Sequence, residues 1–381
     1  MKRVAILVET ALASGRNILA GISQYIREHD DWSVFHPTGY MGATDIAGLV
    51  DWDGDGIIAR ISDPAILKNL KAKNTHIVDV LGNVQKSPFP LVKCDDRKIG
   101  RMVAEHFIGN GHRHFAFLGF SSERWSFERQ EAFGQSLEKE HGQVSLCHLN
   151  PRHQGPAHWH RNLDHVASWV EGLPKPCAML VASDQFGPLA MKACERSGIS
   201  IPEEISIVGV DNDQSFCELC RPQLSSIEPN HTRVGYEAAR LLDALITDER
   251  TSETLLETPP LSLYTRGSSD TMAVSDPALV KAMRFIRQEA CNGISVDHVA
   301  ESAGVSRSVL QRRFKDQLGR TVGDIILSVK LRRARDMLAF TKISIPEIAE
   351  RSGFNYQEYL NYIFKKHLST TPVRFREEAG R

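Results

Sequence analysis

Short apolar runs alternate with amphipathic stretches over the first two thirds of the chain. The runs are four to six residues long and lie at 4–8, 56–59, 76–80, 115–119, 178–182 and 205–210. Between them apolar residues recur with helical spacing, as at Ile18, Ile22 and Ile26. Short strands that alternate with helices indicate parallel sheets covered by helices, with ligands at the carboxyl ends of the strands.

Charged side chains follow several of these expected strands. Asp95, Asp184 and Asp211 come after the apolar stretches that end at 94, 182 and 210, and Arg124, Trp125 and Arg129 follow the run at 115–119. Carboxylates accept hydrogen bonds from sugar hydroxyls, guanidinium groups donate to them, and an indole covers an apolar sugar face. For any one of these residues, a surface ion pair or helix cap is the alternative. No GxGxxG or P-loop occurs at the turns, which disfavours a nucleotide-binding enzyme.

This region resembles the effector-binding domain of LacI-type regulators and periplasmic sugar-binding proteins over about residues 3–268. The motifs that carry the resemblance are 95–100 (DDRKIG), 111–114 (GHRH), 182–184 (ASD), 198–212 (GISIPEEISIVGVDN), 226–229 (SIEP) and 235–239 (GYEAA). It implies a two-lobed α/β sensor of the type I periplasmic-binding-protein-like fold, with the ligand between the lobes. The positions that match the family's ligand contacts are Asp95, Arg129, Asp184 and Asp211, and Arg16 is expected to face the same cleft. LacI-type regulators begin with a DNA-binding helical domain, whereas this sequence begins at the first expected strand, so a DNA-binding module is expected elsewhere in the chain or not at all.

The last third of the chain contains a pattern typical of a helix-turn-helix. Ser295 and Ser306 are expected N-caps of two helices, and Gly304 between them can adopt a positive φ. In the second helix Ser308, Gln311 and Arg312 share one outward face, because they are spaced i, i+3 and i+4. Arginine pairs with guanine and glutamine with adenine in the major groove, and Arg307, Arg313 and Lys315 are expected to contact phosphates.

The same pattern returns 49 residues later, with Ala349 and Gly353 in the places of Ala300 and Gly304. In the helix that follows, Tyr359, Leu360 and Phe364 are expected to point inward, and Gln357, Glu358, Asn361 and Tyr362 outward. A basic helix over 329–338 is expected to connect the two units. One helix-turn-helix pattern alone is weak evidence, but two in tandem with basic residues indicate DNA binding.

This part resembles the AraC/XylS-type DNA-binding domain over 276–378. The signature is Ile345-x-x-Ile348-Ala349-x-x-x-Gly353-Phe354, followed by 364–366 (FKK) and by Thr371-Pro372-x-x-Phe375-Arg376. The resemblance implies an all-α domain with helix-turn-helix motifs at about 295–316 and 345–367. The family often has Arg where Tyr362 stands and Phe where Leu360 stands. The second recognition helix is therefore expected either to contact bases through Asn361 and Tyr362 or chiefly to position the protein.

The formal net charge of −1 conceals two opposite charges. Residues 271–381 carry 19 Lys+Arg against 12 Asp+Glu and are +7, whereas residues 1–270 are −8. A basic module attached to an acidic body is expected when only one part meets phosphate. The seven scattered cysteines and the missing signal peptide and membrane span predict a reduced, cytoplasmic protein. No cofactor or metal site is expected, because the pair Cys217/Cys220 stands alone and the histidines between 148 and 165 lack zinc-protease spacing.

Together these patterns predict a sugar sensor at 1–270, a polar linker at 264–270 and a DNA-binding domain at 271–381. We expect a transcription regulator, an activator rather than a repressor, that acts as a homodimer on repeated half-sites and works with RNA polymerase. The order of the modules and the local sequence Arg124-Trp125 with Arg129 resemble pentose-responsive regulators, which implies D-xylose as the effector. Another pentose or hexose is the alternative. A transport-type sugar-binding protein would need a signal peptide, and no enzyme-like set of nucleophile, base and oxyanion donors is present.

Overall fold

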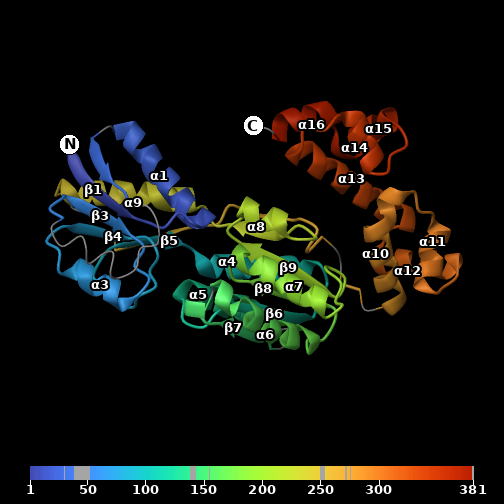
Figure 1. The fold of residues 1–381 in the computed structure, drawn as a ribbon, viewed down its shortest axis with the longest axis horizontal. Helices are drawn as coiled ribbons and strands as arrows, with labels where there is room; N and C mark the ends of the chain where they lie inside the picture. The colour runs from blue at the N-terminus through green and yellow to red at the C-terminus, as the bar shows by residue number, and fades with distance from the viewer. Residues whose placement is uncertain are drawn as a thin grey trace. The chain divides into compact units, whose positions relative to one another are not determined.

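The computed structural model describes residues 1–29, 31–37, 52–137, 143–153, 155–248, 254–270, 273–274 and 276–379. The chain divides into two compact units, Met1–Thr271 and Met272–Arg381. The first unit contains two sheets in separate lobes, and the second is entirely helical (Figure 1). Within the described residues, no helix is both long enough and apolar enough to cross a membrane.

The first lobe is built on a parallel sheet with the strand order β11-β5-β4-β3-β1-β2. Its helices are α1, α3 and α9, of which α1 and α9 pack against each other. Their bounds and those of the strands are β1 (Lys2–Leu7), α1 (Ala13–His29), β2 (Trp32–Phe35), β3 (Gly56–Ala59), α3 (Pro64–Lys71), β4 (His76–Asp79), β5 (Leu91–Cys94), α9 (His231–Ile246) and β11 (Leu255–Thr258).

The second lobe has a sheet with the order β12-β10-β9-β8-β6-β7, in which only β12 runs antiparallel to its neighbour. Strands β8 and β9 are buried along their whole length, which explains why they stand out in the sequence as continuous apolar runs. The elements are α4 (Asp96–Gly109), β6 (His114–Phe120), α5 (Arg124–Leu137), β7 (Ser145–Leu149), η1 (Pro151–His153), η2 (Pro156–His158), α6 (Trp159–Glu171), β8 (Cys177–Val181), η3 (Asp184–Phe186), α7 (Gly187–Arg196), β9 (Ile205–Val210), α8 (Gln214–Leu219), β10 (Ser225–Glu228) and β12 (Ser262–Tyr264).

The close crossing of α1 and α9 depends on two glycines. A Cβ atom on Gly21 would lie 1.9 Å from the Thr232 carbonyl oxygen, and one on Gly235 would lie 1.9 Å from the Ile18 carbonyl oxygen. Neither backbone can yield without separating the helices, so each glycine is required by the packing. This crossing holds the first and last thirds of the sensor together in one lobe.

The chain passes between the lobes three times, from β5 to α4, from β10 to α9 and from β11 to β12. The crossing segments are hydrogen-bonded to one another. The Asp95 backbone nitrogen donates to the Thr258 oxygen at 2.9 Å, and the Leu261 nitrogen donates to the Glu228 oxygen at 2.8 Å. The Cys94 Sγ lies 3.2 Å from the Pro229 oxygen. The crossings therefore form one connected hinge.

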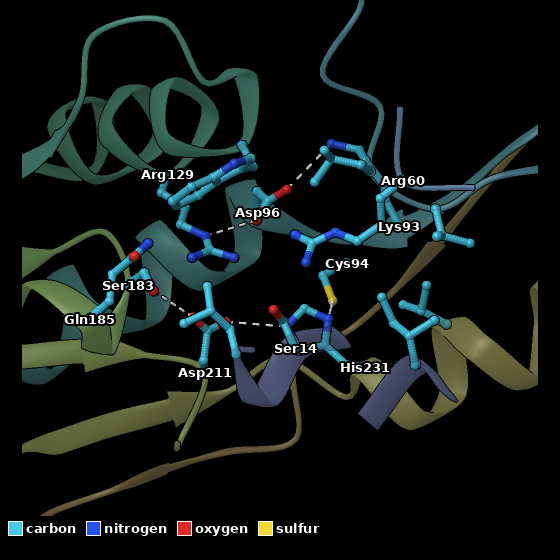
Figure 2. Close-up of a pocket in the computed structure, with 16 residues that line it drawn as sticks. Ser14, Arg60, Lys93, Cys94, Asp96, Arg129, Ser183, Gln185, Asp211 and His231 are labelled. Carbon is cyan, nitrogen blue, oxygen red and sulfur yellow. Dashed lines mark hydrogen bonds and ion pairs between the residues drawn. The ribbon is translucent and has the colours of Figure 1, made fainter. Parts of the chain in front are cut away.

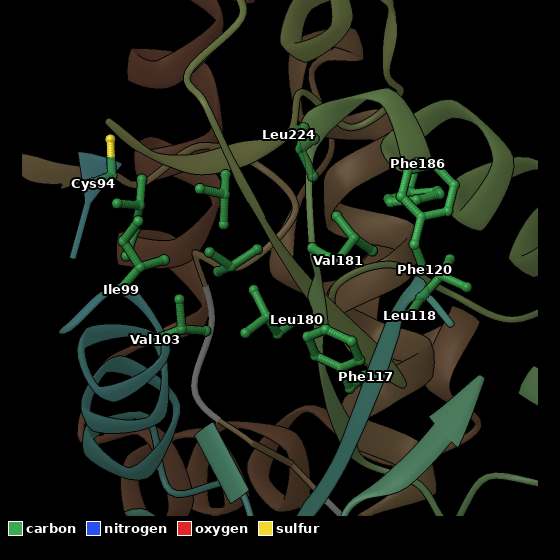
Figure 3. Packing of buried hydrophobic residues seen from close by; sticks show 14 of the residues in the cluster. Cys94, Ile99, Val103, Phe117, Leu118, Phe120, Leu180, Val181, Phe186 and Leu224 are labelled. Atoms are coloured by element: carbon green, nitrogen blue, oxygen red, sulfur yellow. The ribbon is translucent and has the colours of Figure 1, made fainter. Parts of the chain in front are cut away.

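A continuous apolar cluster fills the faces of both sheets around the hinge. In the second lobe it includes Phe117, Leu180 and Val181, while Cys94 lies at its edge (Figure 3). Phe120 and Phe186 meet edge to face, with ring centroids 4.7 Å apart. This packing fixes the strand ends that carry the charged side chains.

The second unit consists of two helix-turn-helix motifs, each with its own apolar cluster. In both, a glycine with positive φ ends the first helix: Gly304 at 69° and Gly353 at 76°. A Cβ on Gly353 would also lie 2.7 Å from backbone atoms of Cys291, so no other residue fits there. The elements are α10 (Pro277–Glu289), η4 (Ala290–Asn292), α11 (Val296–Ala303), α12 (Arg307–Leu318), α13 (Val322–Phe340), α14 (Ile345–Arg351), α15 (Gln357–Leu368) and α16 (Pro372–Ala379).

The structure confirms the expected fold class and corrects the expected linker. Tyr264 belongs to β12, and Ser268 and Ser269 are fully buried in the sensor. The Ser268 hydroxyl donates to the Ile207 carbonyl at 2.6 Å. The polar composition of 264–270 suggested an exposed segment. Serine can nevertheless be buried when its hydroxyl forms hydrogen bonds with backbone groups, and composition does not show where this happens.

Candidate functional site

A cleft lies between the two lobes of the sensor. The first lobe contributes Ser14 and Arg60 to its walls, and the second contributes Arg129, Gln185 and Asp211 (Figure 2). The strands that end here are parallel, so their carboxyl ends bring polar side chains from distant parts of the sequence together. The cleft thus combines apolar walls with a few converging polar groups, as small-molecule sites do.

Arg129, on α5, is the central cation of the cleft and is only 4% exposed. Its Nε donates to Asp96 Oδ1 at 2.8 Å, and its Nη1 donates to the Ala182 carbonyl. The guanidinium carbon lies 4.9 Å from the centroid of the Trp125 ring. Burial disfavours the charged form, but the carboxylates of Asp96 and Asp211 outweigh it and raise the pKa of Arg129. The guanidinium is therefore charged and held in one orientation.

Asp211 follows β9 and has a backbone φ of 113°, a region that L residues seldom adopt. Its carboxylate accepts a hydrogen bond from the Ser183 hydroxyl at 2.7 Å and lies 3.1 Å from His231 Nε2. Burial would raise the pKa of Asp211, but the His231 hydrogen bond and the Arg129 charge lower it below its ordinary value. Backbone strain of this kind is concentrated at functional sites.

Asp184 is buried and does not line the cleft, and its hydrogen-bond partners among the described residues belong to its own lobe. It accepts hydrogen bonds from the Ser226 hydroxyl at 2.7 Å and from the Asp213 backbone nitrogen at 2.8 Å. Burial, and then the negative charge of Asp211, raise the pKa of Asp184 well above its ordinary value. The pKa values of these two acidic residues, which follow neighbouring strands, are thus shifted in opposite directions.

A second charged group is centred on Lys93 of β5, which is 6% exposed. Its ammonium pairs with Glu128 of α5 and lies 3.6 Å from Asp96 and 3.4 Å from Glu257. Glu128 also accepts from Arg124 Nε at 2.8 Å. Burial opposes the charge on Lys93, but the surrounding carboxylates raise its pKa. The group links the hinge strand to the second lobe.

Three of the seven residues expected at a sugar site line this cleft: Trp125, Arg129 and Asp211. The other four lie elsewhere in this conformation. Asp95 caps α4 by accepting from the Lys98 nitrogen, Arg16 lies on α1 and pairs with Asp213, Arg124 pairs with Glu128, and Asp184 is buried and does not line the cleft. Asp96 takes the place expected for Asp95, because the cap residue directs its carboxylate to its own helix.

Several cleft residues were not expected from the sequence: Arg60, Lys93, Asp96, Ser183, Gln185 and His231. Ser183 lies in the motif 182–184 and Gln185 directly follows it, so their position was a usable signal. Arg60 directly follows β3, which was an equally available signal. No sequence signal identified Lys93. A lysine within an apolar strand does not indicate that carboxylates from three other segments lie close to its ammonium group.

On α12, the expected first recognition helix, five of the six residues expected to contact DNA are exposed: Arg307, Ser308, Gln311, Arg312 and Lys315. Arg307 pairs with Asp297 at 3.0 Å on the surface. Arg313, which was expected to contact phosphate, is instead half-buried and pairs with Asp276, the N-cap of α10, at 2.7 Å. Arg313 thus connects two helices within the domain.

On the second recognition helix, α15, Glu358 and Tyr362 are exposed, and Gln357 and Asn361 are half-buried. Tyr359 was expected to point inward but is 50% exposed, and its ring stacks on that of Tyr362 with centroids 6.4 Å apart. Ile363 occupies the inward position together with Leu360 and Phe364. Helical spacing allows either Tyr359 or Ile363 to point inward. Ile363 is buried because its side chain is the more apolar of the two.

Three family profiles match successive parts of the chain. They are a XylR N-terminal domain at residues 3–94, a periplasmic binding protein-like domain at 104–269 and a helix-turn-helix domain at 299–378. A xylose operon regulatory protein from Haemophilus influenzae is 31% identical over 382 residues, which is 98% of this chain and 98% of that protein. The chain belongs to the xylose operon regulatory protein family.

Other members of the xylose operon regulatory protein family agree with this assignment. The Escherichia coli K12 protein is 31% identical over 98% of this chain and 97% of its own length. A solved structure of the xylose-binding transcription activator xylR superposes with a TM-score of 0.84 and 30% identity, covering 99% of this chain and 98% of that one. This chain is accordingly a sugar-responsive, DNA-binding transcription regulator and not an enzyme.

Proposed function

We propose that the chain is an activator that binds D-xylose in the interlobe cleft and alters its hold on DNA when the lobes close on the sugar. The observation that carries the proposal is the convergence of Arg129 and Asp211, a fixed guanidinium and a fixed carboxylate, in one cleft. Sugar hydroxyls accept from the first and donate to the second. Relatives that match along the whole chain bear xylose in their names.

Arg60 is the third residue that we assign to the sugar. Its guanidinium points into the cleft (Figure 2), and within the described residues it has no hydrogen-bond partner. A guanidinium in this position has N–H groups left to donate to the hydroxyls of a bound sugar. Arg60 comes from the first lobe and Arg129 from the second. A sugar held between them would favour the closed arrangement by its differential affinity for it.

Calorimetric titration of the full chain tests the choice of sugar. We expect saturable heat with D-xylose and none with L-xylose, L-arabinose, D-ribose or D-glucose at the same concentration. L-Xylose is the sharpest control, because it has the same groups in mirror-image positions. Binding of another sugar in place of D-xylose would refute the effector assignment and leave the regulator assignment intact.

We also propose that α12 and α15 are the recognition helices. In this proposal Ser308, Gln311 and Arg312 contact base edges, Arg307 and Lys315 contact phosphates, and Gln357, Glu358, Asn361 and Tyr362 form the second contact surface. Seven of these nine residues are exposed on the two helix-turn-helix units, and Gln357 and Asn361 are half-buried beside them, which supports this assignment. The two helices of one chain would enter successive major grooves about 34 Å apart. Footprinting should show two protected grooves per chain, and replacement of Arg312 should weaken the protection at one of them.

The assembly is the remaining part of the proposal. We infer that the regulator works in the cytoplasm as a homodimer on repeated half-sites and contacts RNA polymerase. This arrangement is supported by the two proposed recognition helices of each chain, α12 and α15, and by a relative described as a transcription activator. Light scattering of the chain with DNA of one and of two half-sites tests the dimer. In vitro transcription with added sugar distinguishes an activator from a repressor.

A further inference from the structure

A thiol, an imidazole and a carboxylate lie in line at the hinge. Cys94 Sγ is 3.3 Å from His231 Nδ1, and His231 Nε2 is 3.1 Å from Asp211 Oδ1 (Figure 2). All three residues line the cleft, and they come from the end of β5, the start of α9 and the end of β9. A base oriented by a carboxylate and directed at a sulfur is the arrangement that activates a cysteine for nucleophilic attack.

The hydrogen-bond pattern directs the His231 imidazole at the Cys94 sulfur. When His231 Nε2 donates to Asp211, a neutral imidazole presents Nδ1 to the sulfur as a base, and a protonated imidazole donates from Nδ1 to the sulfur. Burial lowers the pKa of His231, but Cys94 and Asp211 outweigh it and raise that pKa to about 9. A protonated imidazole beside a sulfur stabilises the thiolate, which is the nucleophilic form.

The other cysteines lack such a partner and have the properties of inert thiols. Burial raises the pKa of Cys147, Cys177, Cys194 and Cys220 to about 12. Cys291, in the DNA-binding unit, is the most exposed of the seven free cysteines, and burial still raises its pKa. Exposure alone would make Cys291 the first to react, whereas the environment of the sulfur favours Cys94.

The position of Cys94 gives its modification a structural consequence. Its sulfur also lies 3.2 Å from the Pro229 carbonyl, so it connects the first crossing segment to the second. Cys94 is 5% exposed, and it both lines the cleft and belongs to the apolar cluster of the sensor. An added oxygen must therefore occupy the cleft or separate the crossing segments, and either change opposes closure on a sugar.

We propose that Cys94 is a peroxide-sensitive thiol whose oxidation to a sulfenic acid weakens sugar binding. The cleft would then respond to peroxide as well as to the sugar. The sulfur attacks one oxygen of a hydroperoxide and the O–O bond breaks. The sulfur is oxidised by two electrons and the peroxide is reduced. With hydrogen peroxide the leaving hydroxide takes the Nδ1 proton of His231 and departs as water.

The first experiment uses the full chain and no sugar, so its outcome is independent of which sugar binds. Hydrogen peroxide is added with dimedone, and the labelled cysteine is identified and timed by mass spectrometry. We expect Cys94 to be labelled at least tenfold faster than Cys291. His231→Asn should slow labelling of Cys94 at least tenfold, and Cys291→Ser should leave it unchanged. Faster labelling of Cys291, or no effect of His231→Asn in a variant that retains its circular dichroism spectrum, would overturn the proposal.

The second experiment measures sugar affinity before and after peroxide. It uses D-xylose or, if D-xylose does not bind, the sugar that gives heat in the titration panel. We expect at least a fivefold loss of affinity that dithiothreitol reverses, and no peroxide effect in Cys94→Ser. Equal affinities of the reduced and oxidised wild-type protein would overturn the regulatory part. Failure of D-xylose alone would refute only the effector assignment.

Discussion

Arg16 of the first lobe donates a hydrogen bond to Asp213 of the second, with 3.1 Å between Nη2 and Oδ2. The same carboxylate oxygen accepts from the Ala13 backbone nitrogen at 2.9 Å. The Asp213 nitrogen in turn donates to Asp184. A single residue thus connects the start of α1, in one lobe, to the buried Asp184 of the other, and it makes these contacts only when the lobes are close together.

Asp213→Ala should therefore favour the open arrangement of the sensor. We expect sugar affinity to fall about tenfold, because one charge-assisted and one backbone hydrogen bond across the lobes are lost, on the order of 1.5 kcal/mol. Calorimetric titration measures the change. Replacement of the exposed Arg27 on the same helix α1 by Ala is the matched control and should leave the affinity unchanged. Equal affinity of the Asp213 variant would show that this contact does not contribute to closure.

Arg129→Ala should destabilise the sensor as well as abolish sugar binding. It leaves Asp96 buried without its guanidinium partner, and removal of one member of a buried ion pair costs about 3–5 kcal/mol. Arg129→Lys retains the charge but not the fork that reaches both Asp96 and the Ala182 carbonyl. We expect it to fold nearly as well as the wild type and still not to bind sugar. Urea unfolding and titration of the two variants separate these effects, and full sugar binding by the lysine variant would contradict them.

Arg312 and Arg313 are adjacent in sequence and should behave differently. Arg312→Ala should weaken binding to the preferred DNA by about 1–3 kcal/mol and relax the preference at one base pair. Arg313→Ala loses the pair with Asp276 and should lower the unfolding temperature of the domain with the base preference retained. Selection from a random DNA library, with anisotropy titration, measures both. The same loss of preference in both variants would be inconsistent with this division.

His112 should make the sensor less stable in acid. Both its ring nitrogens are buried without a hydrogen-bond partner among the described residues, and burial lowers the pKa of His112 to about 4. The unfolded chain binds this proton near pH 6.5. The contribution of neutral His112 to the free energy of unfolding is therefore complete above pH 6.5. As the pH falls towards 4, the unfolded chain takes up the proton and the folded chain does not, and the free energy of unfolding falls by about 3 kcal/mol.

Replacement of His112 by Phe should remove this part of the pH dependence. The site is apolar, and the His112 ring meets Phe107 edge to face at 5.6 Å. Urea unfolding at pH 7 and pH 5 compares the variant with the wild type, and His165→Gln, at an exposed position, is the control. If the Phe variant loses as much stability in acid as the wild type, other groups are responsible for the acid sensitivity.

Periodicity predicted the parts of the structure that depend on burial alone. The continuous apolar runs became β8 and β9, and the two helix-turn-helix units carry their glycines at positive φ as expected. These features repeat at fixed intervals and depend on near neighbours. They can therefore be read from one sequence.

The side-chain partnerships at the cleft could not be predicted in this way. Either member of the pair Asp95 and Asp96 could face the cleft, and the choice depends on which residue caps α4. Lys93 is stabilised by Glu128 and Glu257, which are 35 and 164 positions away in the sequence. No local spacing encodes such a set, because it exists only after the crossing segments have come together.

The three crossings between the lobes also limit how such a regulator can be rearranged. Each lobe takes segments from both halves of residues 1–270, since α9 and β11 return to the first lobe after the second is almost complete. No single cut yields an intact lobe, so the sensor must be inherited or transplanted whole. The DNA-binding unit is one uninterrupted stretch. Recombination at a single junction can exchange the DNA-binding unit. A sensor of this build can therefore acquire a new operator specificity more readily than it can acquire one lobe from another sensor.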